Sequence, residues 1–141
     1  KGDLKDTAKR FIKVFRQLPD GVKNRLVLEN EDKPNSWNVD QLYNYIYQET
    51  GIPITYDNLH FRCNTGGLTA KDAVKLSKST WGSYVPLFHF SDNDVKNRNP
   101  RAHAEYPSSF PEEFIDENVD LDFEFKAKDY AIEYFESKLQ K

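Results

Sequence analysis

Residues 69–90 read TAKDAVKLSKSTWGSYVPLFHF and contain the signals for one helix and one strand. Thr69 and Asp72 form a capping box, which predicts a helix that begins at residue 70 and ends near Trp81. Residues 84–90 follow as a short apolar run that is typical of a buried strand. A helix followed directly by a strand is the building unit of an α/β protein.

The same alternation extends in both directions from this unit. Apolar residues recur at helical spacing in some segments and form short strand-like runs in others. The other predicted elements are a helix over 3–18 that stops at Pro19-Asp20-Gly21, a strand over 25–29, a helix capped by Asn38 and Gln41 that ends at Gly51, a strand over 53–57, a helical turn over 111–115, a strand over 119–125 and a helix over 130–139.

Strands that are separated by helices pair in parallel through right-handed crossovers. We therefore expect an α/β fold of four parallel βα units that forms a single domain over residues 1–141. The pattern leaves open whether the strands form a complete open sheet or half of an eight-stranded TIM-type barrel. Residues 91–110 are rich in Asn, Asp, Ser, Pro and Arg and predict a long active-site loop.

Composition excludes several classes of protein. The chain has 141 residues, 38% of them hydrophobic, and a net charge of −3, as expected for a folded domain. Cys63 is the only cysteine, which excludes an internal disulfide and indicates a reducing compartment. The sequence has no apolar run of membrane length and no signal-peptide pattern, so we expect no membrane partner and an intracellular location, in the cytoplasm or nucleoid. Because it begins with Lys1 and lacks methionine, we expect a piece of a longer protein.

The carboxyl ends of the four predicted strands all carry side chains of metal-ligand type. Parallel α/β proteins place their active sites at this edge, because the loops vary there while the sheet fixes their roots. One such residue alone is more often a helix cap or a structural group. Convergence from four strands favours a centre for Zn, Mn or Fe, with carboxylates able to bridge two ions. The candidate ligands are Glu29, Asp57, His60, His89, His103 and Glu124, and they include every histidine of the chain.

Other catalytic patterns are weaker. Gly66-Gly67 lacks the lysine and helix of a phosphate-binding loop and predicts a turn. Cys63 lies three residues from His60, but no third group orients the pair, which argues against a nucleophilic cysteine. Basic residues of the long loop could meet phosphates or form a solvated surface, and the pattern leaves both open. They are Lys96, Arg98 and Arg101.

The strand ends and the long loop contain five segments: RLVLENED (25–32), GIPITYDNLH (51–60), FHFS (88–91), RAHAEY (101–106) and LDFEFKAKD (121–129). In this order they resemble the UV damage endonuclease family. The match spans about residues 25–130, and the five segments are specific only together. That family is similar in fold and metal chemistry to endonuclease IV, an α/β barrel that holds a cluster of divalent ions.

The resemblance implies that the chain is the C-terminal half of such a barrel, and that the N-terminal half is missing. It also implies a role for each candidate ligand. Glu29 would bridge two ions, Asp57, His89 and Glu124 would bind one of them, and His60 with His103 would hold a third.

Three positions depart from the pattern that the resemblance implies. Leu87 stands where the family usually has a lysine, two residues before His89. Arg101 stands where endonuclease IV has an aspartate, and Phe61 where a further histidine is common. We therefore expect one ion site with most of its ligands in this chain and a second site completed by residues outside the chain. A third ion site would have fewer ligands.

The function that the resemblance implies is metal-dependent hydrolysis of the phosphodiester backbone of damaged DNA, which nicks it during repair of UV damage. The cofactors would be Mn or Zn ions, or else Mg, and the partners damaged double-stranded DNA and the missing half of the barrel. Self-association of the isolated chain is also expected, because the outer strands of a half-barrel lack neighbours. The alternatives are a metal-dependent sugar isomerase or epimerase on a related barrel, and a barrel fragment without activity. The expected phosphate contacts are Arg101, Lys126 and Lys128.

Overall fold

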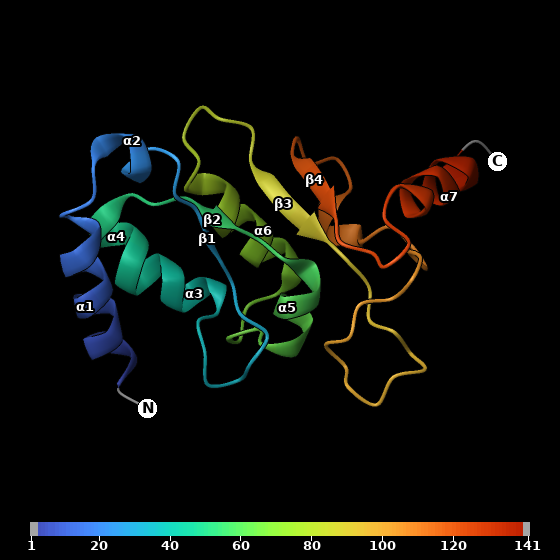
Figure 1. Cartoon of the computed structure of the whole chain (residues 1–141), viewed down its shortest axis with the longest axis horizontal. Coiled ribbons are helices and arrows are strands. Elements are labelled where there is room, and N and C mark those ends of the chain that lie inside the picture. Colours follow the sequence, from blue (N-terminus) through green and yellow to red (C-terminus); the bar gives the residue numbers. More distant parts are fainter. Residues whose placement is uncertain (1–2, 140–141) are drawn as a thin grey trace.

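The computed structural model describes residues 3–139 and shows helices alternating with short parallel strands (Figure 1). In this nomenclature η1 is a π-helix and η2 is a 3₁₀-helix. The elements are α1 (Leu4–Phe15), α2 (Asp20–Lys23), β1 (Leu28–Glu29), α3 (Val39–Leu42), η1 (Tyr43–Tyr47), α4 (Gln48–Thr50), β2 (Ile54–Thr55), α5 (Asn58–Cys63), α6 (Ala70–Ser79), β3 (Leu87–Phe90), η2 (Glu112–Phe114), β4 (Asp120–Phe123) and α7 (Asp129–Leu139).

All strand pairs in the described residues are parallel, as predicted. β1 pairs with β2, and β3 pairs with β4. A parallel bridge between Asp57 and His89 joins the two pairs, and the backbone N–H of His89 donates to the Tyr56 carbonyl at 2.9 Å. The strands therefore follow one another in chain order from β1 to β4.

The strands are shorter than the predicted runs over 25–29, 53–57, 84–90 and 119–125. The reason is that side chains replace the neighbouring strand as hydrogen-bond partners of the backbone. Ile54 N–H, for example, donates to the Thr80 hydroxyl at 2.9 Å, and Ser91 N–H donates to Asn58 Oδ1 at 2.9 Å. These bonds satisfy buried backbone groups without extending the ladder.

The helix that was expected between Asn38 and Gly51 is present. Its capping box is confirmed: Asn38 Oδ1 accepts from Gln41 N–H at 2.9 Å, and Gln41 Oε1 accepts from Asn38 N–H at 3.2 Å. Gly51 ends the helix with a φ of 69°, a conformation that glycine adopts without steric cost. The sequence did not reveal the π-helical turn in the middle.

Two helix ends were predicted wrongly, and two short helices were not predicted. α1 ends at Phe15 rather than residue 18, and Pro19 acts as the N-cap of α2 instead of only stopping a helix. The helix α6 ends at Ser79, before Trp81. α5 was not predicted, because Asp57 was assigned only to the end of a strand, whereas it also caps the helix that follows.

Two hydrophobic cores lie beneath the strands. The first core surrounds β1 and β2 and is mostly aliphatic, whereas the second core surrounds β3 and β4 and is mostly aromatic. The first core consists of Ala8, Ile12, Phe15, Leu42, Ile46, Ile52 and Ile54. The second core consists of Val39, Tyr56, Phe61, Ala73, Val74, Phe88, Phe90, Phe114, Phe125 and Ala131.

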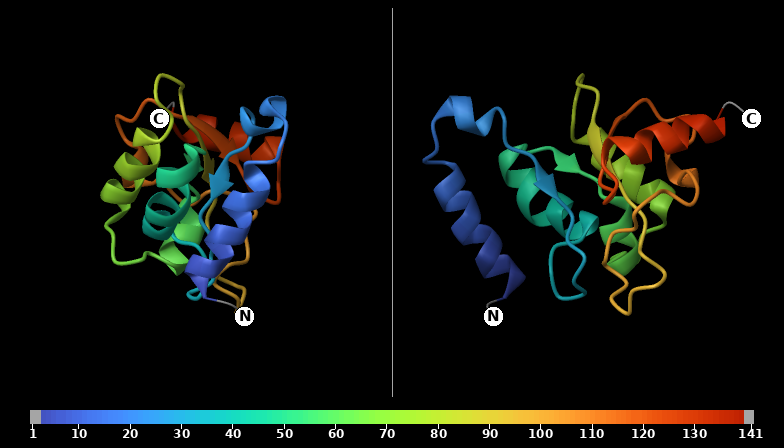
Figure 2. Two further views of the ribbon diagram at one scale, coloured as in Figure 1. Left: turned by 90° about the vertical axis from the view of Figure 1, so that its left-hand side faces the viewer. Right: turned by 45° about the vertical axis from the view of Figure 1, so that its right-hand side comes forward.

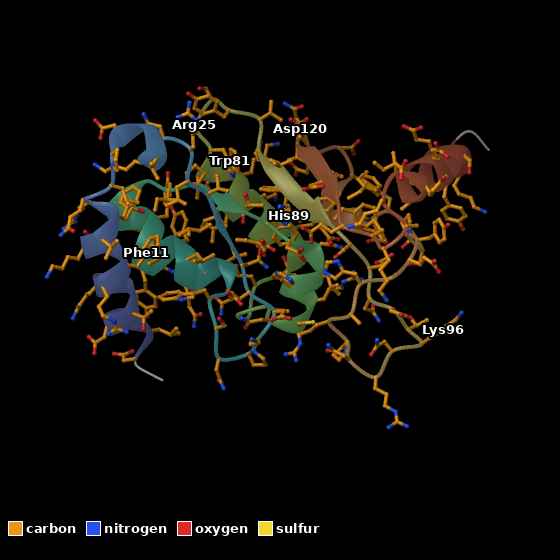
Figure 3. The ribbon with its side chains drawn as sticks, in the orientation of Figure 1. Phe11, Arg25, Trp81, His89, Lys96 and Asp120 are labelled. Atoms are coloured by element: carbon orange, nitrogen blue, oxygen red, sulfur yellow. The ribbon has the colours of Figure 1, made fainter. Side chains whose placement is uncertain are left out.

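The helices α1 and α7 lie at opposite ends of the molecule, with the strands between them (Figures 1 and 2). The loop after β1 and the long loop over 91–110 leave the strands on the same side (Figure 1). Figure 3 places Lys96 of the long loop on that side and Asp120, which begins β4, on the other. The carboxyl ends of the strands thus face the long loop. Among residues 3–139, no helix combines the length and the apolar character needed to cross a membrane.

Candidate metal centre

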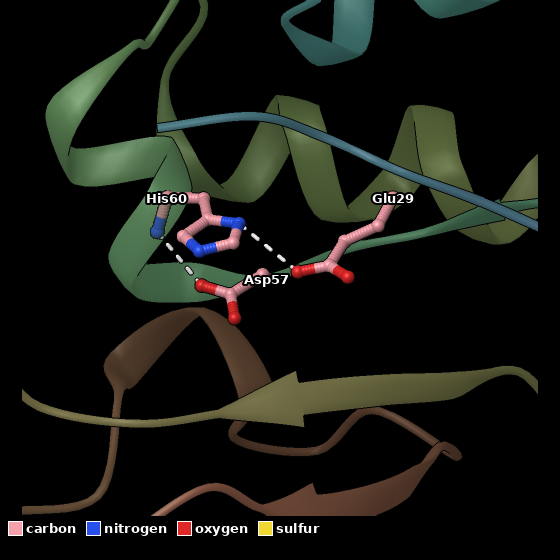
Figure 4. A group of neighbouring side chains, drawn as sticks. All are labelled: Glu29, Asp57 and His60. Atoms are coloured by element: carbon pink, nitrogen blue, oxygen red, sulfur yellow. Dashed lines mark hydrogen bonds and ion pairs between the residues drawn. The ribbon is translucent and has the colours of Figure 1, made fainter. Parts of the chain in front are cut away.

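Three of the predicted ligands lie together where β1 and β2 end (Figure 4). Glu29 is the last residue of β1, Asp57 follows β2, and His60 lies in the first turn of α5. Asp57 Oδ1 caps α5 by accepting from His60 N–H at 2.7 Å, so the cap also sets the spacing of the two residues. Glu29 Oε1 lies 3.0 Å from His60 Nδ1.

His89 connects this group to β4. Its Nδ1 atom lies 3.5 Å from Glu29 Oε1, 3.5 Å from Glu124 Oε1 and 4.0 Å from Asp57 Oδ2. Asp57 is fully buried, and both Asp57 Oδ2 and His89 Nδ1 are buried without a hydrogen-bond partner within the described residues. Burial of unpartnered polar atoms is unfavourable. A divalent cation would satisfy an oxygen and a nitrogen donor placed in this way, so these residues fit a metal ion.

The potential ligand atoms form two overlapping groups. The first ligand group is Glu29, Asp57 and His60, and the second ligand group is Asp57, His89 and Glu124. Within each group the atoms lie within 4.8 Å of one another. Asp57 belongs to both, as expected of a carboxylate that bridges neighbouring ions. The resemblance had implied this bridging role for Glu29, which belongs to the first group alone.

The remaining predicted ligand, His103, lies outside both groups. Its Nδ1 atom is 2.7 Å from the Glu124 carbonyl oxygen, and it forms an antiparallel bridge with Asn93 at the root of the long loop. A carbonyl oxygen can only accept, so the proton is on Nδ1 and Nε2 is free. His103 and Glu124 line a cavity of about 490 Å³ together with Lys126 and Lys128.

The ionisable groups of the centre perturb one another. Burial alone would raise the pKa of Glu29, but the close contacts and the charge of His60 and His89 lower it to about 2. Burial would lower the pKa of His60, but its contacts with Glu29 and Asp57 raise it to about 9. The nearby carboxylate of Glu29 raises the pKa of His89, and burial raises those of Asp57 and Glu124. Protons therefore occupy the centre when metal does not, and metal binding must displace them.

Two of the three expected phosphate contacts have carboxylate partners. Arg101 Nε lies 3.3 Å from Asp32 Oδ2, and Lys126 Nζ lies 3.1 Å from Asp94 Oδ2. Lys128 is exposed and has a φ of 56°, a left-handed conformation that is uncommon for a residue with a side chain. Such strain is found more often at functional sites.

The three departures from the family pattern can also be located. Leu87 lies on β3 two residues before His89, so both side chains lie on the same face of the strand, and Leu87 is 43% exposed. Phe61 is buried in the second core and points away from the ligands. Arg101 binds Asp32 instead of presenting a ligand.

Two residues that were not predicted from the sequence hold the ligand Asp57 and the long loop over 91–110 in place. Asn30 is fully buried and binds the backbone of Asp57. Asp92 accepts from Arg62 at 3.0 Å and from the N–H and hydroxyl of Ser108 at 2.9 and 2.8 Å, which closes the long loop. Both residues stand in polar runs directly after strands, and no local pattern distinguishes them from ordinary loop residues.

Comparison with known proteins identifies close similarity to one group of enzymes. The chain is 29% identical over 138 residues to the UV DNA damage endonuclease of Clostridium perfringens, covering 92% of the chain and 33% of that protein. It is 32% identical over 139 residues to the UV-damage endonuclease of Schizosaccharomyces pombe, covering 91% of the chain and 22% of that protein. The crystal structure of SacUVDE matches it with a TM-score of 0.79 and 30% identity.

The coverage of these matches is asymmetric. The match to SacUVDE includes 98% of this chain but only 48% of that chain, so the chain corresponds to about half of a TIM-type barrel protein. It spans between about a fifth and a half of the length of these relatives. The sequence profile of the family described as UV-endonuclease UvdE matches residues 1–141. The chain therefore belongs to the UV-endonuclease UvdE family, a family of UV damage endonucleases.

Proposed function

We propose that this chain is the C-terminal half of the barrel of a metal-dependent endonuclease, which nicks UV-damaged DNA by hydrolysing a phosphodiester bond. The observation that carries the proposal is the pair of ligand groups that share the buried Asp57. Family membership supports the same reaction, and the names of the relatives favour it over a sugar isomerase. The ions would be Mn or Zn, with Mg as the third choice for an oxygen-rich set.

Bound divalent ions would supply an activated water and neutralise charge on the phosphate and leaving oxygen. The chain's own residues position these components. Asp57 and Glu29 present carboxylate oxygens from adjacent strands, while His60 and His89 present imidazoles that must be neutral to act as ligands. Glu124 approaches from β4 and closes the second ligand group.

The phosphate would bind beside Glu124, where Lys126 and Lys128 line the cavity with His103. Lys128 is exposed, and Lys126 forms only an exposed ion pair with Asp94, which a phosphate can displace at small cost. Arg101 would contact DNA after leaving Asp32 or act by holding the long loop. Lys96 and Arg98, exposed on the same loop, extend this positive charge toward the duplex backbone.

The expected partner of this chain is the remaining half of the barrel, whose strands would pair with the free edges of β1 and β4. Within residues 3–139, β1 pairs with β2 alone and β4 pairs with β3 alone, so both outer strands offer unpaired backbone groups. We expect the isolated chain to bind the other half of the barrel or to self-associate. Sedimentation that shows a monodisperse monomer of the isolated chain would contradict this part of the proposal.

The test of the function is nicking of UV-irradiated plasmid DNA in the presence of Mn²⁺. A protein that contains this chain together with the rest of the barrel should nick irradiated plasmid and leave unirradiated plasmid closed. Glu124→Gln should abolish nicking, whereas Asp120→Asn, an exposed residue at the start of β4 on the side away from the long loop and outside both ligand groups (Figure 3), should retain it. The isolated chain should bind ions more weakly and nick no DNA. Isomerisation of a sugar without nicking would instead support the alternative.

A further inference from the structure

The side chain of Asn30 makes an unusual pair of bonds directly beyond β1. Asn30 is fully buried, its Oδ1 atom accepts from Asp57 N–H at 2.8 Å, and its Nδ2 atom donates to the Asp57 carbonyl at 3.1 Å. The carboxamide therefore binds both polar groups of one backbone residue. In a parallel ladder, the carbonyl that accepts from Asp57 N–H and the N–H that donates to its carbonyl would come from two different peptide groups of the neighbouring strand.

The register of the ladder shows what this side chain replaces. Leu28 pairs with Ile54, and Leu28 N–H donates to the Pro53 carbonyl at 2.9 Å. Continued by two residues, this parallel pattern would have the backbone carbonyl of Asn30 accept from Asp57 N–H. Because Oδ1 takes that bond, the backbone carbonyl is left for another donor.

That donor is a candidate metal ligand. His60 Nδ1 lies 2.8 Å from the Asn30 carbonyl oxygen, which can only accept, so Nδ1 must carry the proton. The other acceptor near Nδ1 is Glu29 Oε1 at 3.0 Å, and it requires the same proton. Both contacts leave Nε2 as the ring atom that can bind an ion once the imidazole is neutral.

We propose that Asn30 is a positioning residue of the first ligand group, which places Asp57 through its carboxamide and selects the metal-binding nitrogen of His60 through its carbonyl. This inference rests on the proposed function, because it assigns Asn30 a role toward the proposed ions. Asn30 therefore links Asp57 and His60, which follow β2, to Glu29, the residue that precedes it in the sequence. Asn30 itself does not touch the ion.

The chain offers a matched control in Asn64. Its side chain is also buried, at 8% exposure, and its Nδ2 atom lies within 3.2 Å of the carbonyl oxygens of Glu31, Lys33 and Ser36. None of these three is a candidate ligand. Asn30→Ala and Asn64→Ala each remove a buried carboxamide that connects two segments of the chain. Only the carboxamide of Asn30 binds a candidate metal ligand, Asp57.

The experiment measures Mn²⁺ affinity by calorimetry and thermal unfolding in EDTA for the chain and its variants. Asn30→Ala should weaken binding at the first ligand group about 10- to 100-fold, the range observed when groups that support metal ligands are lost. Asn64→Ala should lower the unfolding temperature but leave Mn²⁺ affinity within about twofold of wild type. If Asn30→Ala fails to fold, Asn30→Ser retains one hydroxyl for Asp57 and should show a smaller loss of affinity.

A second readout follows the histidine directly. Long-range ¹H–¹⁵N spectra of the Zn²⁺-loaded chain should show His60 bound through Nε2 with its proton on Nδ1. Asn30→Ala should shift or broaden these signals, because the carbonyl of residue 30 can then accept from Asp57 N–H instead of from His60 Nδ1. If Asn30→Ala keeps the wild-type Mn²⁺ affinity and an unchanged His60 spectrum, this inference is wrong, but the proposed metal function is not affected. If a protein that contains this chain together with the rest of the barrel binds neither Mn²⁺ nor Zn²⁺, the proposed metal function fails and this inference fails with it.

Discussion

The region around β1 and β2 buries mostly aliphatic side chains, whereas the region around β3 and β4 buries aromatic rings. The two ligand groups differ in which strands position their residues. Glu29, Asp57 and His60 lie at or just after the ends of β1 and β2, whereas the second ligand group joins Asp57 to His89 of β3 and to Glu124, which follows β4. The first group therefore depends on contacts between β1 and β2, while the second requires the β1–β2 pair and the β3–β4 pair to be held together.

One helix cap and one side-chain bridge between β1 and β2 hold the first group. Asp57 caps α5, which fixes its distance to His60, and Asn30 ties both to the end of β1. The second group relies instead on the bridge between Asp57 and His89 and on the pairing of β3 with β4.

Loss of one ring from the second core should destabilise the chain most. Phe90 has ring centroids of Phe110, Phe123, Phe125 and Phe135 within 6.1 Å, so Phe90→Ala should lower the free energy of unfolding by about 3–5 kcal/mol. Urea denaturation measures the change. As a control, Tyr84→Ala removes an aromatic side chain that is 79% exposed and should change stability by less than about 0.5 kcal/mol. Equal effects of the two substitutions would show that the aromatic packing does not stabilise this region.

Removing the shared ligand should affect both groups together. Asp57→Asn should weaken Mn²⁺ binding at both sites by at least about 100-fold, because it removes a carboxylate charge that both sites use. The metal-free chain should lose little stability, since the substitution also removes a fully buried carboxylate with an unpartnered oxygen. Calorimetric titration and thermal unfolding in EDTA give the two values. Normal binding at either site would show that Asp57 is not shared.

Removing an unshared ligand should separate the groups. Glu124→Gln should reduce Mn²⁺ binding at the second ligand group about 10- to 100-fold and leave the first intact, and His60→Ala should do the reverse. Binding isotherms that resolve two sites measure the difference. If each substitution weakens both sites equally, the two ligand groups act as one centre and the distinction between them is wrong.

The metal-free first group should also stabilise the fold in a defined pH range. The pKa of Glu29 is lowered to about 2 from 4.5, so its contribution is complete above pH 4.5 and is lost as the pH falls toward 2. The pKa of His60 is raised to about 9 from 6.5, so its contribution is complete below pH 6.5 and is lost as the pH rises toward 9. The difference in unfolding free energy between wild type and Glu29→Gln, measured in EDTA, should therefore be largest between pH 4.5 and 6.5. A difference that does not vary between pH 2 and 9 would contradict this ion pair.

The smallest effect is expected where the long loop meets the loop after β1. Arg101→Ala removes a partly exposed ion pair with Asp32 and should cost about 0.2–1 kcal/mol of stability, and less at high salt. Thermal unfolding at two salt concentrations checks the value. A much larger loss would mean that this contact, rather than the network of Asp92, holds the long loop in place.

Sequence alone determined the features that depend on neighbours within a few residues. The capping box of Asn38 and Gln41 and the left-handed Gly51 follow from local hydrogen bonding and steric rules, and both are present. Alternation of helices and strands was enough to predict parallel pairing. The clustering of metal-ligand types at strand ends was also visible, because carboxyl ends of parallel strands share one edge.

Only the tertiary structure decided the lengths of the strands and the details of the centre. Asn30 and Asp57 are 27 residues apart, so no local pattern could show that a side chain replaces the backbone in the ladder. Likewise, His103 was grouped with His60 from the resemblance, whereas the structure places it against the carbonyl of Glu124, outside both ligand groups. Residue types at strand ends predict that donors converge, but the distances between donors depend on long-range hydrogen bonds and packing, which form only when the chain is folded.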